Sequence, residues 1–173
     1  MKNLLLLVLI YSTIGCANVD SKNGAEIDSD VEAIVVPDSV LVEKGFFKYY
    51  EGKPFTGTSK FFLFDSSTFW TSYIDGLKDG LRVQTSKDGD TLIVEGFKYG
   101  TYHGVHKSYY DNGNLLKSKN FVYGKEVGVS VKYHKNGKLQ YETVMKDGYC
   151  YRQFHWDENG NLLANKLSEF ERY

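Results

Sequence analysis

Cysteine and proline are scarce in this chain of 173 residues, and no apolar run is long enough to cross a bilayer as a helix. The longest such run near the start, residues 4–11, falls far short of the roughly 20 apolar residues that a membrane-spanning helix needs. With only two prolines, the aromatic content of 16% points to strands and tight turns. The hydrophobic content of 42% fits one modest domain with extra segments.

A strong charge of one sign is confined to a single segment. Residues 17–38 hold six acidic groups against one base, whereas residues 39–173 hold 19 Lys and Arg against 16 Asp and Glu. The resulting excess of three positive charges is spread along the chain, which excludes the dense basic patch of a nucleic-acid binder. Low hydrophobicity and one sign of charge predict that the acidic segment is a flexible tether. Alternatively, Val31 to Val36 adds a strand to the edge of the domain.

Residue sets for catalysis or metal binding are also missing. No Ser, His and Asp set, and no Cys and His set, occurs in a strand–turn–helix context, and no glycine-rich loop precedes a helix. His103 and His106 flank Gly104, but no Cys, Asp or Glu stands beside them at metal-ligand spacing. The sequence therefore predicts no enzyme, no cofactor and no metal site.

The N-terminus has the layout of an export signal. Lys2 precedes the apolar run, and Thr13-Ile14-Gly15-Cys16 follows it. These four residues resemble the lipobox of bacterial lipoproteins, in which the cysteine becomes the acylated first residue. The resemblance implies a signal peptide at 1–15, a lipidated Cys16 that begins a tether at 16–39, and anchoring to a membrane of the bacterial cell envelope. An ordinary secretory signal that is cleaved nearby is the alternative.

A repeat of 24 residues runs through the remaining region, 40–173. Glycine recurs at this step, at Gly52, Gly76, Gly100, Gly124 and Gly148. Asp-Gly or Asn-Gly pairs end at Gly89, Gly113, Gly137 and, one residue early, Gly160. Such pairs between alternating apolar stretches are strong hairpin signals. The sequence thus predicts an all-β domain, an extended antiparallel meander of repeated 24-residue β-hairpins.

The loop at Asn136-Gly137 allows two registers. A two-residue loop would place Tyr133 opposite a polar residue, whereas a three-residue loop would pair Tyr133 with Leu139 and Val131 with Tyr141. The second register is favoured because it gathers apolar side chains on one face, with the glycine at positive φ in a bulge. The predicted apolar face carries Val83, Ile93, Phe97, Val105, Tyr109, Leu115, Phe121, Val129, Val131, Tyr133, Leu139, Tyr141 and Met145.

The repeat also carries a family likeness. The motif Tyr109-Tyr-Asp-Asn-Gly-Asn-Leu115, followed by Phe121 and Gly124-Lys-Glu-Val-Gly128, resembles the MORN-repeat variant of many bacterial proteins, a group that includes YwqK-type antitoxins. The resemblance implies a repeat scaffold without catalysis that binds a partner protein, in the manner of an antitoxin or immunity protein. A structural component of the cell envelope that binds glycan or lipid is the alternative.

Aromatic residues near the predicted loops are the candidates for partner binding, since Tyr and Trp dominate interface energetics. Packing across strands is the competing interpretation, because β-sheets select aromatic residues for it. The predicted partner-binding residues are Tyr102, Tyr110, Tyr151 and Trp156. The glycines predicted to have a structural role in turns are Gly89, Gly113, Gly137 and Gly160.

Overall fold

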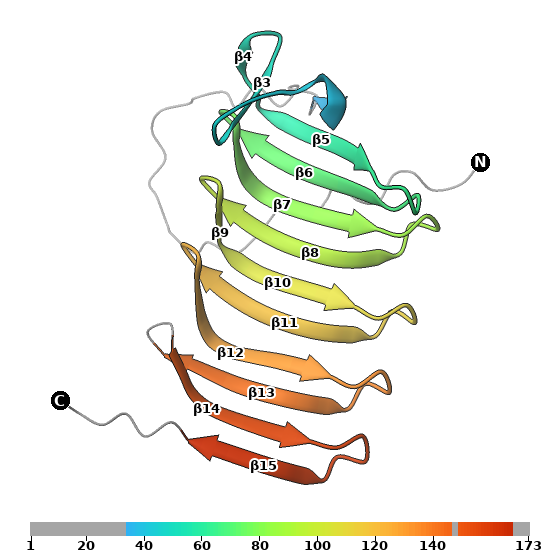
Figure 1. The fold of residues 1–173 in the computed structure, drawn as a ribbon, viewed down its shortest axis with the longest axis vertical. Coiled ribbons are helices and arrows are strands. Elements are labelled where there is room, and N and C mark those ends of the chain that lie inside the picture. The colour runs from blue at the N-terminus through green and yellow to red at the C-terminus, as the bar shows by residue number, and fades with distance from the viewer. Residues whose placement is uncertain (1–33, 147–148, 168–173) are drawn as a thin grey trace, which may run out of the picture. The chain divides into compact units, whose positions relative to one another are not determined.

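The computed structural model describes residues 34–146 and 149–167, which lie in one compact unit that spans 32–173. The predicted signal peptide, the lipidated Cys16 and the tether up to residue 33 lie outside the described residues, as do residues 168–173. In chain order the elements are β1 (Val35–Pro37), the 3-10 helix η1 (Asp38–Val40), β2 (Val42–Lys44), β3 (Phe47–Tyr50), β4 (Lys53–Pro54), β5 (Gly57–Phe62), β6 (Thr68–Ile74), β7 (Leu77–Thr85), β8 (Thr91–Lys98), β9 (Thr101–Tyr102), β10 (Gly104–Tyr109), β11 (Leu115–Val122), β12 (Lys125–Tyr133), β13 (Leu139–Lys146), β14 (Tyr149–Trp156) and β15 (Leu162–Leu167) (Figure 1).

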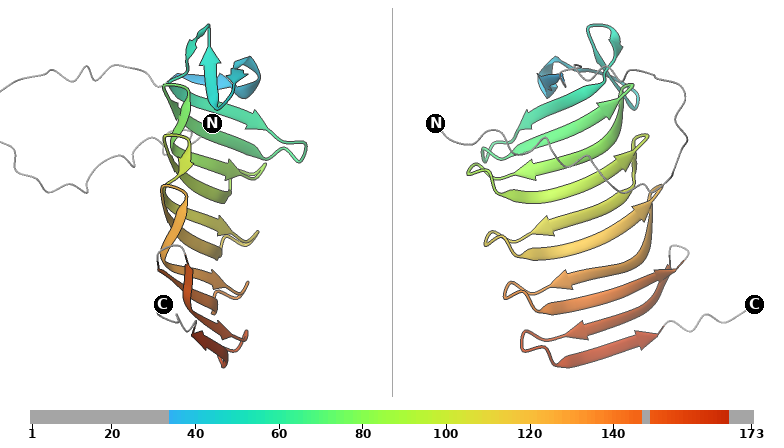
Figure 2. Two further views of the ribbon diagram at one scale, coloured as in Figure 1. Left: turned by 60° about the vertical axis from the view of Figure 1, so that its left-hand side comes forward. Right: turned by 180° about the vertical axis from the view of Figure 1, so that it is seen from behind.

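The described strands confirm the predicted all-β meander of repeated hairpins. Within the described residues, β5 to β8 and β10 to β15 follow one another in a 12-stranded sheet, in which β9 pairs with β8. β1 lies parallel to β5 at one edge, so the acidic segment ends in a strand. Strands β2, β3 and β4 form a separate three-stranded sheet beside the β5 end (Figures 1 and 2). In the part of the chain that the structure describes, no helix is long and apolar enough to span a bilayer.

The hairpins close with the predicted three-residue loop. After β12, the Gly137 N–H donates to the His134 carbonyl at 2.9 Å, and the His134 N–H donates to the Lys138 carbonyl at 2.8 Å. This is a type I turn followed by a glycine bulge, with Gly137 at φ 83°. The β5–β6 loop has the same hydrogen bonds, but Ser66 occupies the glycine position at φ 65°. The same bonds and a positive φ recur at Gly89, Gly113 and Gly160.

A second bulge follows the glycine bulge and overturns part of the predicted register. Tyr133 pairs with Leu139 as predicted, but the next residue, Lys132, pairs with Tyr141. Gln140 is therefore an extra residue on its strand, and Val131 faces Glu142 instead of Tyr141. The same one-residue shift occurs in the hairpins β7–β8, β10–β11 and β14–β15.

The shift makes the prediction of a single apolar face wrong, because a one-residue slip sends the following side chains to the opposite face. Phe121 pairs with Gly104 and lies on the same face as His106, with their ring centroids 4.5 Å apart. Tyr109 lies on the opposite face, although the prediction placed it on the same face as Phe121. Each face of the sheet consequently mixes apolar and polar side chains.

The opposite ends of the strands turn through two-residue loops. Both residues of Tyr99–Gly100 and of Tyr123–Gly124 have positive φ, as in a type I′ turn. The Gly100 N–H donates to the Lys78 carbonyl, and the Gly124 N–H donates to the Tyr102 carbonyl, each at 2.8 Å. Gly76 makes the same kind of bond to the Phe55 carbonyl, so Gly76, Gly100 and Gly124, three of the glycines that recur every 24 residues, each join their unit to the one before it.

The buried core is small and lies at the β1 end of the sheet. Val36, Leu41, Phe55 and Tyr73 form it, and Tyr50 packs against it. The Phe55 ring centroid is 6.0 Å from that of Tyr50 and 5.8 Å from that of Tyr73. Among the other described residues, one apolar side chain, that of Phe97, is also buried. The array is therefore held mainly by hydrogen bonds and contacts between neighbouring units, as expected of a repeat protein.

Candidate binding surface

Tyr102 belongs to an aromatic row on one face of the sheet. Its ring centroid lies 4.9 Å from that of Phe97, 4.4 Å from that of His106 and 5.5 Å from that of Phe121. Its hydroxyl is 3.5 Å from Glu95, and burial together with the charge of Glu95 raises the pKa of this hydroxyl. Because 39% of Tyr102 is still exposed, the residue packs between units and also presents an edge to solvent.

The other predicted binding residues lie apart from Tyr102. Tyr110 follows the end of β10 and Trp156 ends β14, so both are next to loops with the glycine bulge. Tyr102, in contrast, follows the type I′ turn at the opposite end of the strands. Tyr151 is 44% exposed in the first half of β14, and the Trp156 ring stacks on that of Phe154 at 5.5 Å. The structure does not gather these four residues into one site.

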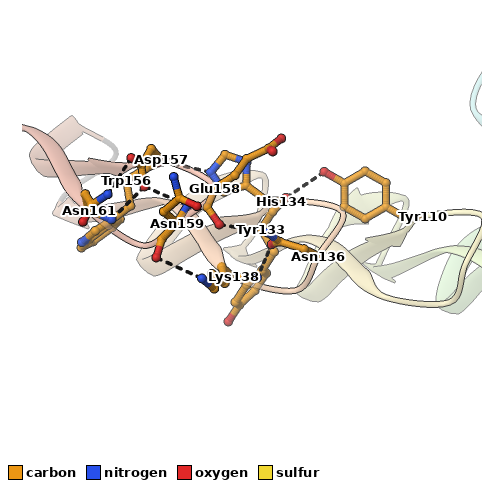
Figure 3. Close-up of polar contacts among 10 residues, drawn as sticks. All are labelled: Tyr110, Tyr133, His134, Asn136, Lys138, Trp156, Asp157, Glu158, Asn159 and Asn161. Atoms are coloured by element: carbon orange, nitrogen blue, oxygen red, sulfur yellow. Dashed lines mark hydrogen bonds and ion pairs between the residues drawn. The ribbon is translucent and has the colours of Figure 1, made fainter.

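Side chains of neighbouring glycine-bulge loops form a ladder along one edge of the array (Figure 3). The Tyr110 hydroxyl donates to the Tyr133 carbonyl of the next unit at 2.8 Å. One unit further, His134 Nε2 lies 2.9 Å from the Trp156 carbonyl. Tyr110 is thus a link between units. Further bonds from side chains to carbonyls of the next loop come from Asn112, Asn114, Asn136 and Lys138.

A cleft of about 730 Å³ lies between the β2–β3 hairpin and the sheet face that carries Thr71 and Arg82. We call this face of the sheet the cleft face. Three separate parts of the chain line the cleft: residues 38–48, strands β5 to β7 and the turn at 99–101. Of its aromatic residues, Phe46 is 93% exposed and Tyr99 is 64% exposed. The aromatic side chains of the lining are Phe46, Phe47, Phe61, Phe69, Tyr73 and Tyr99.

Two cations of the cleft are paired with carboxylates. Lys48 Nζ lies 3.4 Å from Asp38 and 3.1 Å from Glu43. Burial by itself would lower the pKa of Lys48, but the hydrogen bond to Glu43 and the charge of Asp38 raise it overall. Arg82 lies 3.4 Å from Glu95 on the neighbouring strand. These ion pairs lie in the walls of the cleft. Because Lys48 and Arg82 are already paired with carboxylates, neither is the preferred partner for an anionic ligand.

Lys78 is a cleft cation without such a partner. Among the described residues, none of the carboxylates lies within 4.0 Å of its ammonium group. The ammonium instead lies 5.2 Å from the centroid of the Phe97 ring. Burial, and then repulsion by Arg82, lower the pKa of Lys78. An anion that enters the cleft would favour the charged form of this lysine.

Sequence analysis misses the cleft. The lining residues come mainly from the chain before Gly76, where the repeat pattern is weakest, and they have no common spacing. The cleft forms because the β2–β3 hairpin folds against the sheet, where the Lys48 N–H donates to the Gly76 carbonyl at 2.8 Å. The one local sign of an exposed apolar site in the sequence was the pair Phe46-Phe47, which follows a glycine and breaks the alternation of apolar and polar residues expected of a strand.

The two histidines that flank Gly104 have different neighbours. The His103 ring lies 4.9 Å from that of Tyr123, whereas His106 Nε2 lies 3.0 Å from the Gly96 carbonyl. Across residues 34–146 and 149–167, no three side chains of His, Cys, Asp or Glu are close enough to share a metal ion.

The fold, with glycine-bulge loops at one end of the strands and type I′ turns at the other, defines a β-sheet repeat protein, a scaffold of stacked 24-residue hairpins. Residues 102–123 and 126–147 match the family model of the MORN repeat variant. The two matched segments begin 24 residues apart, which is the step of the glycines. No curated protein matches the chain. The cleft is lined by residues that precede both matched segments.

Proposed function

We propose that this protein is a non-catalytic, membrane-tethered scaffold that binds another protein through the cleft face of its sheet. The exposed aromatic side chains of the cleft carry this proposal. Phe46, Phe47, Phe61 and Tyr99 are 93%, 40%, 48% and 64% exposed, although they lie around one cleft. Large apolar groups exposed together mark interaction sites, and aromatic residues contribute most to binding at such sites. The match to the MORN repeat variant supports a scaffold for binding.

The tether gives this scaffold its place at the membrane. In the proposal, Cys16 carries lipid and the acidic residues that follow it hold the repeat domain away from the surface of the bacterial envelope. The pattern of the first 16 residues supports this part. If the partner is a toxin, the scaffold acts as an antitoxin or immunity protein by covering it, which the resemblance to YwqK-type proteins supports.

A photo-crosslinking amino acid placed at Phe46 in the full-length chain tests the proposal in cells that make the protein. The matched control is Val105, which is 43% exposed on the opposite face of the sheet. We expect light to produce a crosslinked protein species of discrete mass from position 46 and none from position 105. Crosslinks to lipid or glycan alone, or equal protein crosslinks from both positions, would refute binding of a protein at the cleft. Growth arrest by the captured protein when the scaffold is depleted would identify it as a toxin.

A further inference from the structure

We infer that the cleft binds a protein segment that presents a carboxylate next to aromatic or aliphatic side chains. This inference rests on the proposed function and adds the chemistry of the partner. The carboxylate pairs with Lys78, and the apolar side chains of the segment pack on the rings of Phe46 and Phe61. Neither contact requires a change in the ion pairs that already line the cleft.

The pairing of charges in the lining leaves Lys78 as the place for an anion. Both carboxylates of the lining, Asp38 and Glu43, pair with Lys48, and Arg82 pairs with Glu95 on the neighbouring strand. Among the described residues, Lys78 is therefore the cation of the lining that has no carboxylate within 4.0 Å. A partly buried cation that lacks a close carboxylate loses hydration, and the Phe97 ring at 5.2 Å replaces only part of that interaction. A carboxylate at hydrogen-bond distance restores that interaction and adds a charge-assisted hydrogen bond.

The walls of the cleft select an apolar body for the same ligand. Phe46 and Phe61 expose ring surface to the space in which Lys78 lies. The Phe69 ring already stacks against the Arg82 guanidinium at 4.0 Å, so it contributes an apolar surface beside a cation. The volume of about 730 Å³ falls within the range of roughly 300–1,000 Å³ that is usual for ligand sites.

A second group of cations extends this site along the cleft face. Lys117 and Lys132 are direct partners on β11 and β12, and the ladder from Gln84 through Ile93 and Ser108 places them on the cleft face. Among the described residues, no carboxylate lies within 4.0 Å of either ammonium group.

Repulsion within this second pair favours a ligand that neutralises it. Burial, and then the charge of Lys119, lower the pKa of Lys117. Like charges directly opposite each other destabilise a strand pair. β11 is three strands from β7, about 14 Å across the sheet at the usual strand spacing. The pair is level with Gln84, six residues along β7 from Lys78, which adds about 20 Å along the strand. An extended partner segment of about eight residues or more, with acidic residues at both ends, can therefore reach both Lys78 and this pair.

The lining favours a polypeptide over a membrane or a nucleic acid. Asp38 and Glu43 stand at the same cleft and repel a dense array of phosphates. The site also lies between the β2–β3 hairpin and the sheet, a space that a single extended segment can enter. A peptide chain meets both conditions, because it spaces its carboxylates apart and can alternate them with apolar side chains.

Fluorescence anisotropy with two labelled probes tests the inference on the full-length chain. The first probe is a six-residue peptide that alternates glutamate and phenylalanine, and the second replaces each glutamate by glutamine. We expect the acidic probe to bind at least tenfold more tightly than the neutral one. Lys78→Met should weaken binding of the acidic probe about tenfold or more, because it removes a charge-assisted hydrogen bond. Lys78→Arg, which keeps the charge, should retain binding within about threefold.

The matched control is Lys87→Met, which removes the same charge from an exposed loop residue. Equal weakening by Lys87→Met and Lys78→Met, or equal binding of the two probes, would overturn the inference. Binding to phosphatidylglycerol vesicles that depends on Lys78, without binding of the acidic probe, would overturn the choice of a protein ligand. If the acidic probe fails to bind while position 46 still crosslinks to a protein, the inference fails and the proposed function stands. If the probe binds and the crosslink is absent, the proposed function fails.

Discussion

Gly96 in β8 is expected to tolerate alanine worse than the loop glycine Gly113, although only Gly113 has a positive φ. A Cβ atom on Gly96 would lie 2.1 Å from the His103 carbonyl oxygen, far inside any allowed contact. The Gly96 carbonyl also accepts a hydrogen bond from the His103 N–H at 2.9 Å and lies 3.0 Å from His106 Nε2. Alanine therefore forces the β9 segment away from β8 and disturbs both contacts.

The two costs can be estimated separately. Loss of two hydrogen bonds costs about 1–3 kcal/mol, and overpacking of a closed site costs about 1–3 kcal/mol more. Gly96→Ala should thus lower the free energy of unfolding by about 2–6 kcal/mol. At Gly113, φ is 82° and a new Cβ would meet no atom within 4 Å. Gly113→Ala should cost only the strain of positive φ, about 1–2 kcal/mol.

Urea unfolding of the full-length chain, followed by far-ultraviolet circular dichroism, measures both variants against the wild type. Equal slopes of free energy against urea must be established first, since a changed slope means that the unfolding transition itself has changed. A result in which Gly113→Ala destabilises as much as Gly96→Ala, or more, would refute the close approach of β9 to β8.

Three further outcomes are expected. Ser66→Gly should raise the free energy of unfolding by about 1 kcal/mol, because Ser66 holds φ at 65°; a urea midpoint that stays the same or falls would contradict the assigned loop. Tyr110→Phe should lower this free energy by about 1 kcal/mol, because it removes the hydrogen bond to the Tyr133 carbonyl and keeps the ring. An unchanged midpoint would show that this hydrogen bond of the turn ladder contributes nothing to stability. Cys16→Ser should abolish labelling by radioactive palmitate and release the protein from membranes, and retention of the label would exclude lipidation at this residue.

The geometry of the glycine-bulge loops could be predicted from local sequence. Asn-Gly and Asp-Gly pairs, and the early pair ending at Gly160, each produced the expected three-residue loop with a glycine at positive φ. A loop of this kind depends on a few consecutive residues, so its geometry can be read from their conformational preferences. The pair Tyr133 and Leu139 follows directly from that loop.

Local sequence did not predict which side chains lie on each face of the sheet. Gln140 and its counterparts in three other hairpins add one residue after the first pair, and no glycine or proline marks the position. The bulge is set by the hydrogen bonds between neighbouring strands, which a single hairpin sequence does not reveal. The resulting slip moved Phe121 to the face of His106 and divided the expected apolar face between both sides.

Hairpins, repeat length and turn types follow from the order of residues, because each depends on contacts within about one repeat. The cleft depends on contacts across more than one repeat. Lys48 meets Gly76, and residues near 46, 78 and 99 enclose one space only after the β2–β3 hairpin has folded onto the sheet. A lysine such as Lys78, which has no carboxylate within 4.0 Å among the described residues, has no signature in sequence, because the distance to a counter-ion is a property of the folded neighbourhood. Tertiary structure alone therefore located the surface to which we assign binding.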